Sequence, residues 1–251
     1  MKPIVIVTAP VHPYLTQRLQ DKGFEVVLSE KITYNELENC IASATGLVVS
    51  TRIKIDQSLL EKAVALKWIA RLGSGMELID TTFAASKNIV CVSSPEGNAG
   101  AVGEHAIALL LNLMNKVSAS FAEVKNGMWI RDANRADALL GKTVGIIGLG
   151  HTGNAFAGRL QSFGVKILAH DKYKQETELK NIEFVDLATL CAQADVVSLH
   201  LPLTPETHHY ASTSFFASLV KSPYFINTCR GKVADTSAVI AALKNGQRSE
   251  E

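Results

Sequence analysis

Cysteine, an excess of one charge and long hydrophobic runs are all scarce in this sequence. Its 251 residues contain four cysteines with no Cys-x-x-Cys pair, and the seven histidines form no His-Glu-x-x-His motif. Neither a disulfide framework nor a zinc site is therefore expected, and no other metal site is indicated. The cysteines are expected to be buried, reduced thiols at positions 40, 91, 191 and 229.

The charge balance argues against several classes of partner. Lys plus Arg total 25 and Asp plus Glu total 24, a net charge of +1 that gives no electrostatic reason to bind nucleic acid. The most apolar stretch, Ala106 to Leu111, is far shorter than the roughly 20 residues that span a bilayer. The N-terminal residues MKPIVIVTAP indicate a buried strand rather than a signal peptide. We expect a cytoplasmic protein with no membrane partner.

Two α/β series are predicted, with a domain boundary between residues 98 and 99. In domain 1–98, short β-branched runs alternate with helical patterns, as in parallel βαβ units. Gly23 marks a helix end, and Thr33–Glu36 and Ser58–Glu61 both read as capping boxes. Nearly continuous apolar runs such as IVIV indicate a sheet covered on both faces. The predicted strands of this domain are residues 4–8, 24–28, 47–50, 68–72 and 89–92.

Domain 99–251 opens with a long helix after the loop 93–98. The segment 100–117 is apolar around most of its circumference, which predicts burial on more than one side. A second subunit and core packing alone are both open explanations. The later strands are predicted at 144–148, 166–170, 195–200 and 224–229, and the later helices at 154–163, 187–194, 214–219 and 236–244.

The most informative local pattern is GIIGLGHTGNAFAGRL, in which Gly148, Gly150 and Gly153 form G-x-G-x-x-G between a strand and a helix. The first glycine permits the turn, the second lets a diphosphate approach the backbone, and the third allows close helix–strand packing. Asp171 ends the next strand, near the offset of about 20 residues at which a carboxylate binds a ribose. The pattern predicts a dinucleotide site that favours NAD over NADP, although Lys172 and Lys174 weaken that preference.

Two other interpretations of the glycine pattern stay open at this point. The glycines also suit a tight strand-to-helix turn that binds no ligand. An S-adenosylmethionine-dependent methyltransferase also has a glycine-rich turn and a ribose-binding acid, although it would have no use for the arginine motif described below.

Five segments together carry a family resemblance. They are residues 70–80 (ARLGSGMELID), 93–111 (SSPEGNAGAVGEHAIALLL), 141–153 (GKTVGIIGLGHTG), 200–207 (HLPLTPET) and 226–235 (INTCRGKVAD). In this order they resemble the NAD-dependent D-isomer-specific 2-hydroxyacid dehydrogenases, above all the members that act on 3-phosphoglycerate. The resemblance implies an α/β fold with a flavodoxin-like substrate domain and a Rossmann NAD-binding domain. It also implies a homodimer formed through helix 100–117.

The same resemblance implies roles for individual residues. Arg230 is expected to bind the substrate carboxylate and polarise its carbonyl, as a planar and permanently charged guanidinium can. The expected cofactor contacts are Ser74, Gly148, Gly150, His151, Thr152, Gly153, Asp171, Leu201, Pro202, Thr207, Thr228, Cys229 and Arg230. The expected substrate contacts are Arg52, Gly73, Ser74, Gly75 and Asn98.

Three of these side chains also have plainer interpretations. Arg52 is equally well explained as a solvated loop charge, and Arg230 as a surface arginine after a strand. His200 stands at a strand end and invites assignment as the catalytic base, but we interpret it as structural, because the matching motif belongs to the cofactor-side loop.

The resemblance further implies a strand, an Asp, a Glu and a His beyond helix 236–244, where this sequence ends in Gln247-Arg-Ser-Glu-Glu251. We therefore expect a C-terminally truncated member that lacks the last Rossmann strand and is nearly inactive by itself. The expected activity is hydride transfer between NAD(H) and a small 2-hydroxy or 2-keto acid, such as 3-phosphoglycerate. The alternative is a catalytically silent NAD-binding or sensing module of the same fold.

Overall fold

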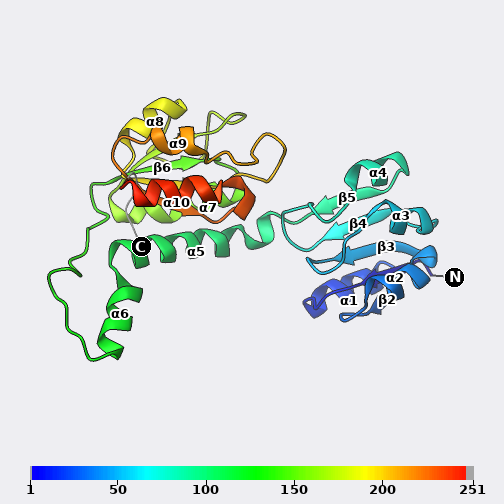
Figure 1. The fold of residues 1–251 in the computed structure, drawn as a ribbon. Helices are drawn as coiled ribbons and strands as arrows, with labels where there is room; N and C mark the ends of the chain where they lie inside the picture. The colour runs from blue at the N-terminus through cyan, green and yellow to red at the C-terminus, as the bar shows by residue number, and fades with distance from the viewer. Residues whose placement is uncertain (1, 247–251) are drawn as a thin grey trace. The chain divides into compact units, whose positions relative to one another are not determined.

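The computed structural model describes residues 2–246, and the chain divides between Asn98 and Ala99 into two compact units. In the first unit, strands and helices alternate (Figure 1). Its elements are β1 (Ile4–Val7), α1 (Pro13–Asp21), β2 (Glu25–Leu28), α2 (Tyr34–Cys40), the 3-10 turn Ile41–Ser43, β3 (Ala44–Val49), α3 (Gln57–Lys62), β4 (Trp68–Arg71), α4 (Thr81–Ser86) and β5 (Val90–Ser93).

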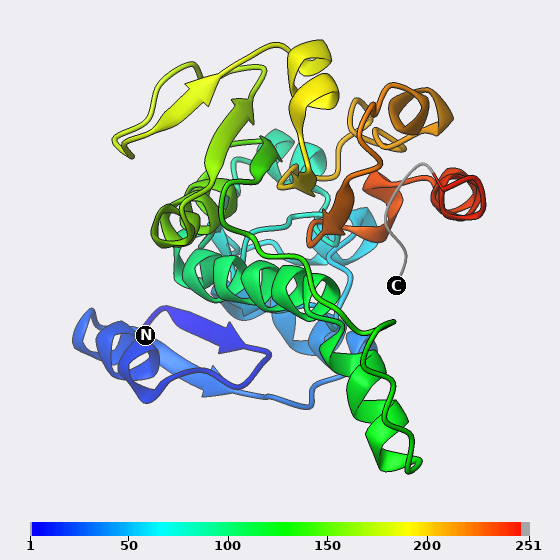
Figure 2. The ribbon, with the colours of Figure 1, turned by 90° about the vertical axis from the view of Figure 1, so that its left-hand side faces the viewer.

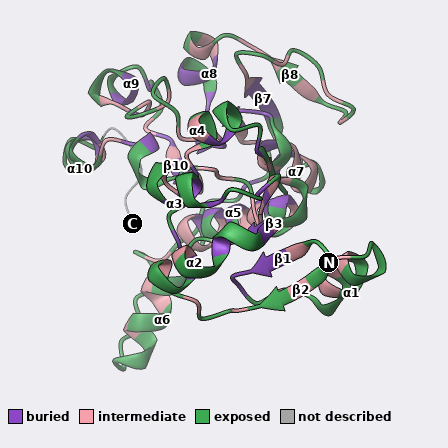
Figure 3. Cartoon of the chain, turned by 90° about the vertical axis from the view of Figure 1, so that its right-hand side faces the viewer, coloured by how far each residue is buried: buried purple, intermediate pink, exposed green. Residues whose placement is uncertain are grey.

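The strands of this first unit form a parallel sheet in the order β2-β1-β3-β4-β5. That is the flavodoxin-like order, so the predicted α/β fold class is confirmed for this unit. Apolar side chains cover both faces of its central strands. Leu15 and Leu19 of α1 pack on one face, and Leu37 and Leu59 from α2 and α3 pack on the other. Figure 3 shows β1 buried beside the exposed edge strand β2.

The second unit contains the remaining elements. They are α5 (Glu96–Met114), whose first turn includes the division, α6 (Val117–Lys125), β6 (Thr143–Ile147), α7 (His151–Leu160), the 3-10 turn Gln161–Phe163, β7 (Lys166–His170), β8 (Ile182–Phe184), α8 (Leu187–Gln193), β9 (Val196–Leu199), α9 (Thr213–Ala217), β10 (Tyr224–Asn227), the 3-10 turn Gly231–Val233 and α10 (Thr236–Lys244).

These strands form a second parallel sheet in the order β10-β9-β6-β7-β8. Numbered within the unit, the order is 3-2-1-4-5 read from the other edge, which is that of the first five strands of the Rossmann order 3-2-1-4-5-6. Helices cover both faces of the sheet. Leu110 of α5 and Phe156 of α7 pack on one face, whereas Leu190 of α8, Phe216 of α9 and Ala238 of α10 pack on the other. The ends of β6 and β9 therefore lie side by side at the carboxyl edge of the sheet.

Several expectations about local structure need correction. The Ser58–Glu61 capping box is wrong, because Asp56 caps α3 and accepts a hydrogen bond from the Leu59 N–H at 3.3 Å. The long helix begins at Glu96, inside the predicted loop, and ends at Met114 rather than at residue 117. Helix α7 begins at His151, three residues earlier than predicted. The short elements α6 and β8 were not predicted. By contrast, the Thr33–Glu36 capping box is confirmed.

The cysteine expectation is wrong in part. All four thiols are free, but Cys191 alone is fully buried, while Cys40 is exposed and the other two are half-buried. Cys40 stands at the polar C-terminal end of α2, where the turn Ile41–Ser43 takes the chain back toward the sheet. No single helix of the described residues is long and apolar enough to cross a membrane. Helices α5 and α6 are long and apolar enough only when they are taken together, and a bend of 59° separates them.

Candidate functional site

Two positions of the turn between β6 and α7, Gly148 and Gly153, have no room for a side chain. Gly148 has a φ of +89°, and a Cβ there would lie 2.6 Å from the carbonyl oxygen of His200. A Cβ on Gly153 would lie 2.1 Å from the carbonyl oxygen of Gly148. Real Cβ atoms do not approach backbone oxygens so closely, so both positions require glycine. The turn therefore packs directly on the end of β9.

The start of α7 differs from most helix starts in the described residues. Its N-cap is Gly150, which has no side chain with which to cap the first turn. A Cβ built on Gly150 meets no described atom within 4 Å, so this side of the turn is open. His151 and Thr152 follow as the first helical residues. A helix start without an N-cap side chain, at the positive end of the helix dipole, suits an anion such as a diphosphate.

Asp171 links the segment after β7 to this turn. Its Oδ2 accepts a hydrogen bond from the Leu149 N–H at 2.7 Å, and its Oδ1 accepts from the N–H groups of Tyr173 and Lys174 at 2.9 and 3.0 Å. An ionised carboxylate has about four acceptor sites, so the three bonds leave capacity for a sugar hydroxyl. The structure thus places the predicted ribose acid beside the predicted diphosphate loop.

Both lysines near Asp171 contact oxygen atoms of other residues. Lys172 forms an ion pair with Glu206, and the Tyr173 hydroxyl donates to the same carboxylate at 3.3 Å. Lys174 Nζ donates to the Leu149 carbonyl at 3.5 Å. Hydrogen bonding with Glu206 raises the pKa of Lys172 and lowers that of the glutamate. These contacts tie the segment after β7 to the segment after β9.

The segment after β9 is folded on itself beside that ion pair. The Thr207 hydroxyl donates to the Pro202 carbonyl at 2.5 Å, and the Thr204 N–H donates to the Thr207 hydroxyl at 2.8 Å. The N–H of Leu201 donates to Cys229 Sγ at 3.0 Å, which brings the segment after β10 alongside. Leu201, Pro202 and Thr207 therefore belong to the same edge of the sheet as Asp171.

Thr228, Cys229 and Arg230 follow β10 at this edge. Thr228 Oγ1 is buried and has no hydrogen-bond partner among the described residues. Burial raises the pKa of Cys229 to about 11, so the thiol stays protonated at neutral pH. The Arg230 side chain is exposed, and its Nη1 donates to the Cys229 carbonyl at 2.8 Å. A guanidinium held through one terminal nitrogen still has other N–H donors, which suit a carboxylate that approaches from solvent.

His200 lies directly beneath the glycine turn. It is 7% exposed, its ring lies against Phe156 at a centroid distance of 5.2 Å and a tilt of 33°, and its Nε2 lies 2.9 Å from the Ser198 hydroxyl. Burial lowers the pKa of His200 to about 4, so the ring is neutral at physiological pH. Its Nδ1 has no partner among the described residues. A neutral ring packed between strand and helix supports the turn, in keeping with the structural interpretation.

The predicted substrate residues belong to the first unit. Gly73 to Gly75 follow β4, with a Gly73 φ of +116°, and the Gly73 carbonyl accepts from the Ser94 N–H at 3.0 Å. Arg52 follows β3, and its Nη2 donates to the carbonyls of Thr8 and Glu30 at 3.0 and 2.5 Å. Arg52 therefore joins the ends of neighbouring segments. Asn98 is exposed in the first turn of α5.

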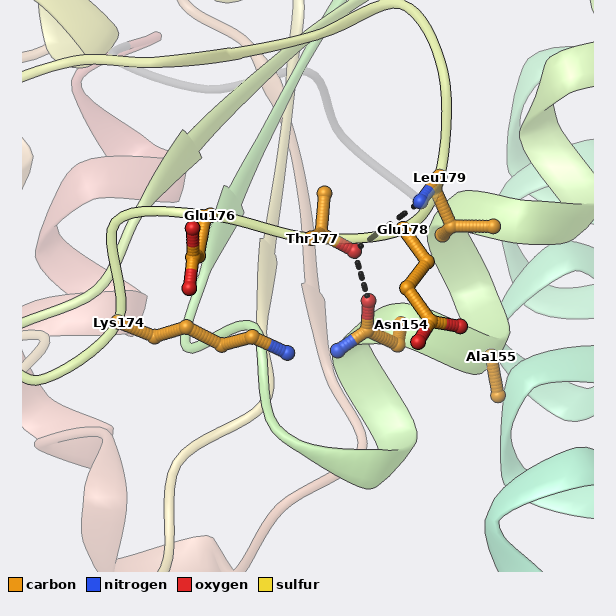
Figure 4. Close-up of a pocket in the computed structure, with 7 residues that line it drawn as sticks. All are labelled: Asn154, Ala155, Lys174, Glu176, Thr177, Glu178 and Leu179. Carbon is orange, nitrogen blue, oxygen red and sulfur yellow. Dashed lines mark hydrogen bonds between the residues drawn. The ribbon is translucent and has the colours of Figure 1, made fainter.

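Sequence reasoning missed Asn154, the residue that joins the glycine turn to the segment after β7. It lines a cavity of about 760 Å³ together with Ala155, Lys174, Glu176, Thr177, Glu178 and Leu179. Figure 4 shows the Asn154 amide facing the Thr177 hydroxyl, with the Lys174 ammonium pointing toward it. The residue stands one position after the third glycine, where the motif specifies no residue type, so the pattern gave no signal.

Comparison with known proteins identifies the family of the second unit. Residues 107–250 match the family described as D-isomer specific 2-hydroxyacid dehydrogenase, NAD binding domain. The chain is 35% identical to D-3-phosphoglycerate dehydrogenase of Methanocaldococcus jannaschii, over 97% of this chain and 47% of the relative. It is also 35% identical to hydroxypyruvate reductase of Thermotoga maritima, over 97% of this chain and 79% of the relative.

Solved structures have the same fold. A glyoxylate reductase from Paecilomyes thermophila matches with a TM-score of 0.89 and 25% identity, covering 98% of this chain and 79% of the other. The D-lactate dehydrogenase of Aquifex aeolicus complexed with NAD and lactic acid matches with a TM-score of 0.83 and 29% identity, covering 98% and 74%. The chain thus spans about half the length of the phosphoglycerate dehydrogenase relative and more than two thirds of these structures.

Proposed function

Because the chain belongs to the D-isomer-specific 2-hydroxyacid dehydrogenases, we propose that it transfers a hydride between NAD(H) and a small 2-hydroxy or 2-keto acid. The observation that carries the proposal is the hydrogen bond from the Leu149 N–H to Asp171 at 2.7 Å. It joins an uncapped glycine turn to an acceptor of ribose hydroxyls.

The cofactor of this family's domain is NAD, and the second unit fits it. The open side of Gly150 leaves space for a diphosphate, and the crowded Gly148 and Gly153 bring the helix N–H groups close. The unpartnered Thr228 Oγ1 offers a buried polar contact at the same edge. We propose as cofactor contacts the set expected from the sequence, from Gly148 to Arg230, with Ser74 from the first unit. When bound, NAD accepts or donates the hydride.

Arg230 is proposed as the catalytic residue. Its guanidinium would bind the substrate carboxylate through two parallel hydrogen bonds and stabilise negative charge on the keto oxygen. The donation of its Nη1 to the Cys229 carbonyl orients the group. The neighbouring thiol stays protonated, because burial raises its pKa to about 11, and it adds no competing negative charge.

We propose the first unit, residues 1–98, as the substrate domain and the second unit as the cofactor domain. Gly73, Ser74, Gly75 and Asn98 would contact the substrate through backbone and small polar groups. Arg52 would attract an acidic substrate while its Nη2 stays on the Thr8 and Glu30 carbonyls. A phosphorylated acid resembling 3-phosphoglycerate is the proposed substrate. Relatives named for hydroxypyruvate and glyoxylate make these the competing candidates.

Two measurements test the proposal. NADH binding is followed by fluorescence, and NADH oxidation is then assayed with 3-phosphohydroxypyruvate, hydroxypyruvate, glyoxylate and pyruvate. Binding is expected, with slow turnover of one of these acids. Binding without turnover would favour the NAD-binding module, and absence of NADH binding would refute the proposal.

The Arg230→Gln variant sharpens that assay. Loss of a preorganised donor to a developing oxyanion typically lowers kcat by about 100- to 1000-fold. The NADH dissociation constant is expected to change much less than kcat. The control is Arg135→Gln, because Arg135 is an exposed arginine paired with Asp132 at 3.0 Å. Equal turnover by the Arg230 variant and the control would exclude the proposed role.

We also propose that two copies of the chain associate beside helix 100–117. One side of α5 packs on its own sheet through Ala106, Leu110 and Met114. Beyond its end, α6 projects from the second unit (Figure 2) and exposes Phe121, which is 69% accessible, and Trp129 follows at 84%. Val117 and Val124 extend the apolar side of α6. Apolar side chains gathered in this way are typical of an interface.

Sedimentation measurements test this association. The unmodified protein is expected to sediment as a dimer, and Phe121→Asp is expected to sediment as a monomer. Val64→Asp is the matched control, because Val64 is 83% exposed but lies in the first unit. A monomeric unmodified protein would contradict the proposed association.

A further inference from the structure

Asn154 joins three parts of the second unit that are separate in the sequence. From the fourth position of α7, its Nδ2 donates to the carbonyl oxygens of Leu149 and Gly150 at 2.6 and 2.9 Å. Its Oδ1 accepts from the Thr177 hydroxyl at 2.8 Å (Figure 4). The amide orientation follows from its partners, because carbonyl oxygens cannot donate a hydrogen bond. One side chain thus connects the glycine turn, the helix and the segment after β7.

These contacts determine the direction of two backbone N–H groups. In a trans peptide, the C=O and the N–H point in opposite directions, and no cis peptide occurs in the described residues. The Leu149 carbonyl shares its peptide with the Gly150 N–H, and the Gly150 carbonyl shares its peptide with the His151 N–H. The Asn154 amide holds the Leu149 carbonyl on its own side, and the Gly150 carbonyl is held there both by that amide and by the backbone N–H of Asn154 at 2.9 Å. Both N–H groups therefore point away from it, as donors to a diphosphate must.

Thr177 connects this arrangement to the ribose acid. Thr177 and Asp171 belong to the same segment after β7, and Asp171 accepts a hydrogen bond from the Leu149 N–H at 2.7 Å. The Leu149 residue is thus held at its N–H by Asp171 and at its C=O by Asn154. The bonds from Thr177 through Asn154 to the turn form a chain in which each hydrogen bond polarises the next. The diphosphate loop is therefore hydrogen-bonded to the segment after β7 both through Asp171 and through Asn154.

We infer that Asn154 is a positioning residue for the dinucleotide diphosphate, with Thr177 fixing the orientation of its amide. This inference rests on the NAD binding proposed above. Asn154 acts through the backbone of the turn, so its removal changes how firmly the phosphate groups are held. The hydride-transfer step, which depends on Arg230, is unaffected once the cofactor is bound.

The test compares ligands with and without a diphosphate. In Asn154→Ala, the dissociation constants of NADH and ADP-ribose are expected to rise about five- to tenfold, the loss typical of one or two hydrogen bonds. Adenosine has no phosphate, so its dissociation constant is expected to stay within about twofold, and kcat likewise. Thr177→Val is expected to weaken ADP-ribose binding about two- to threefold, and Thr177→Ser is expected to restore it.

Asn115→Ala is the control variant for this test. Asn115→Ala removes a similar bond, from Nδ2 to the Leu111 carbonyl at 3.0 Å, far from the glycine turn in the sequence, and should bind ADP-ribose normally. If the unmodified protein binds neither NADH nor ADP-ribose, the proposed function fails and this inference fails with it. If the unmodified protein binds and Asn154→Ala binds equally well, the inference alone is overturned. Should Asn154→Ala not fold, the Thr177 pair decides: equal binding by the Val and Ser variants overturns the inference.

Discussion

The first strand-to-helix turn of each unit shows how similar α/β architecture is fitted to different tasks. In the first unit, α1 begins with Pro13, which has no N–H, and the His12 Nδ1 accepts a hydrogen bond from the Tyr14 N–H at 3.2 Å. In the second unit, α7 begins at His151, and its N-cap residue, Gly150, has no side chain to cap it. The first helix is capped by the side chain of its own N-cap residue, whereas the N-cap residue of the second is a glycine and has no side chain to do so.

The difference between the two helix starts comes from their N-cap residues, because the topology around both turns is the same. Both turns follow the strand at which the order of their sheet reverses, the position where open α/β sheets bind ligands. A binding site at such a position therefore also requires uncapped N–H groups and space beside them. The variants below test that requirement, from the largest expected effect to the smallest.

Gly153→Ala should have the largest effect. Its Cβ would lie 2.1 Å from the Gly148 carbonyl, so the turn must move away from β9. NADH affinity is expected to fall about a hundredfold or more, and the free energy of unfolding by roughly 1–3 kcal/mol. Calorimetry and urea unfolding measure the two quantities.

The matched control for that variant is Gly158→Ala in the same helix. Its Cβ would meet Leu179 at 3.7 Å, an ordinary contact, and alanine favours helix. Binding by this control should be normal and its stability equal or higher. A comparable loss of NADH affinity in both variants would mean that any alanine in α7 disrupts the site. The close contact between Gly153 and the Gly148 carbonyl would then not explain the effect.

Acid should destabilise the second unit through His200. Its pKa is about 4 when folded and about 6.5 when unfolded, so between these values the unfolded chain binds more protons. Stability is therefore present above pH 6.5 and is lost as the pH falls toward 4. This group should lower the free energy of unfolding by about 2 kcal/mol between pH 7.5 and pH 5.

The His200→Asn variant isolates that contribution, because every other titrating group is the same in both proteins. Urea unfolding at the two pH values should show a loss smaller by about 2 kcal/mol in the variant than in the unmodified protein. Identical losses in the two proteins would show that the histidine is not held neutral beneath the glycine turn.

Gly150→Ala is expected to weaken NADH binding without lowering the stability of the fold. Its backbone φ of −74° and ψ of −153° lie beside the extended region of alanine, and the added methyl group meets no described atom within 4 Å. Thermal stability should be unchanged, whereas NADH binding should weaken about tenfold, because the methyl group occupies space that the diphosphate needs. Undiminished NADH affinity would place the diphosphate elsewhere.

The smallest effect is expected at the first turn of the other unit. His12→Ala removes the cap of α1 and should lower the free energy of unfolding by about 0.5 kcal/mol. NADH binding should be unaffected, and thermal unfolding with a parallel titration measures both. Weaker NADH binding by this variant would contradict the division of tasks between the two turns.

Much of the fold could be predicted from the sequence. The strand 166–170 and the helix 236–244 are found at the predicted residues, because apolar runs and cap residues act over a few neighbouring positions. Helix α6 escaped prediction, because its apolar side chains lie on the surface instead of marking a buried face. Strand β8, with three residues, is too short to show a period.

The candidate site was predictable to a similar extent. Gly148 and Gly153 are required by contacts that the motif encodes, and Asp171 stands at the spacing the motif demands. The ion pair between Lys172 and Glu206 joins segments that follow different strands, so no local sequence pattern could predict it. The expectation that both lysines weaken the preference for NAD overlooked that Lys172 is paired and that Lys174 reaches the Leu149 carbonyl.

The sequence by itself determined which segments become strands and helices, where the glycine turn lies and which family the chain resembles, since these depend on residue types within short windows. Only the tertiary structure decided that Asp171 and Asn154 hold opposite sides of Leu149, and that His200 is neutral beneath the turn. The reason is geometric. Parallel pairing brings the ends of β6, β7 and β9 to one edge, and side chains far apart in the chain become neighbours only there.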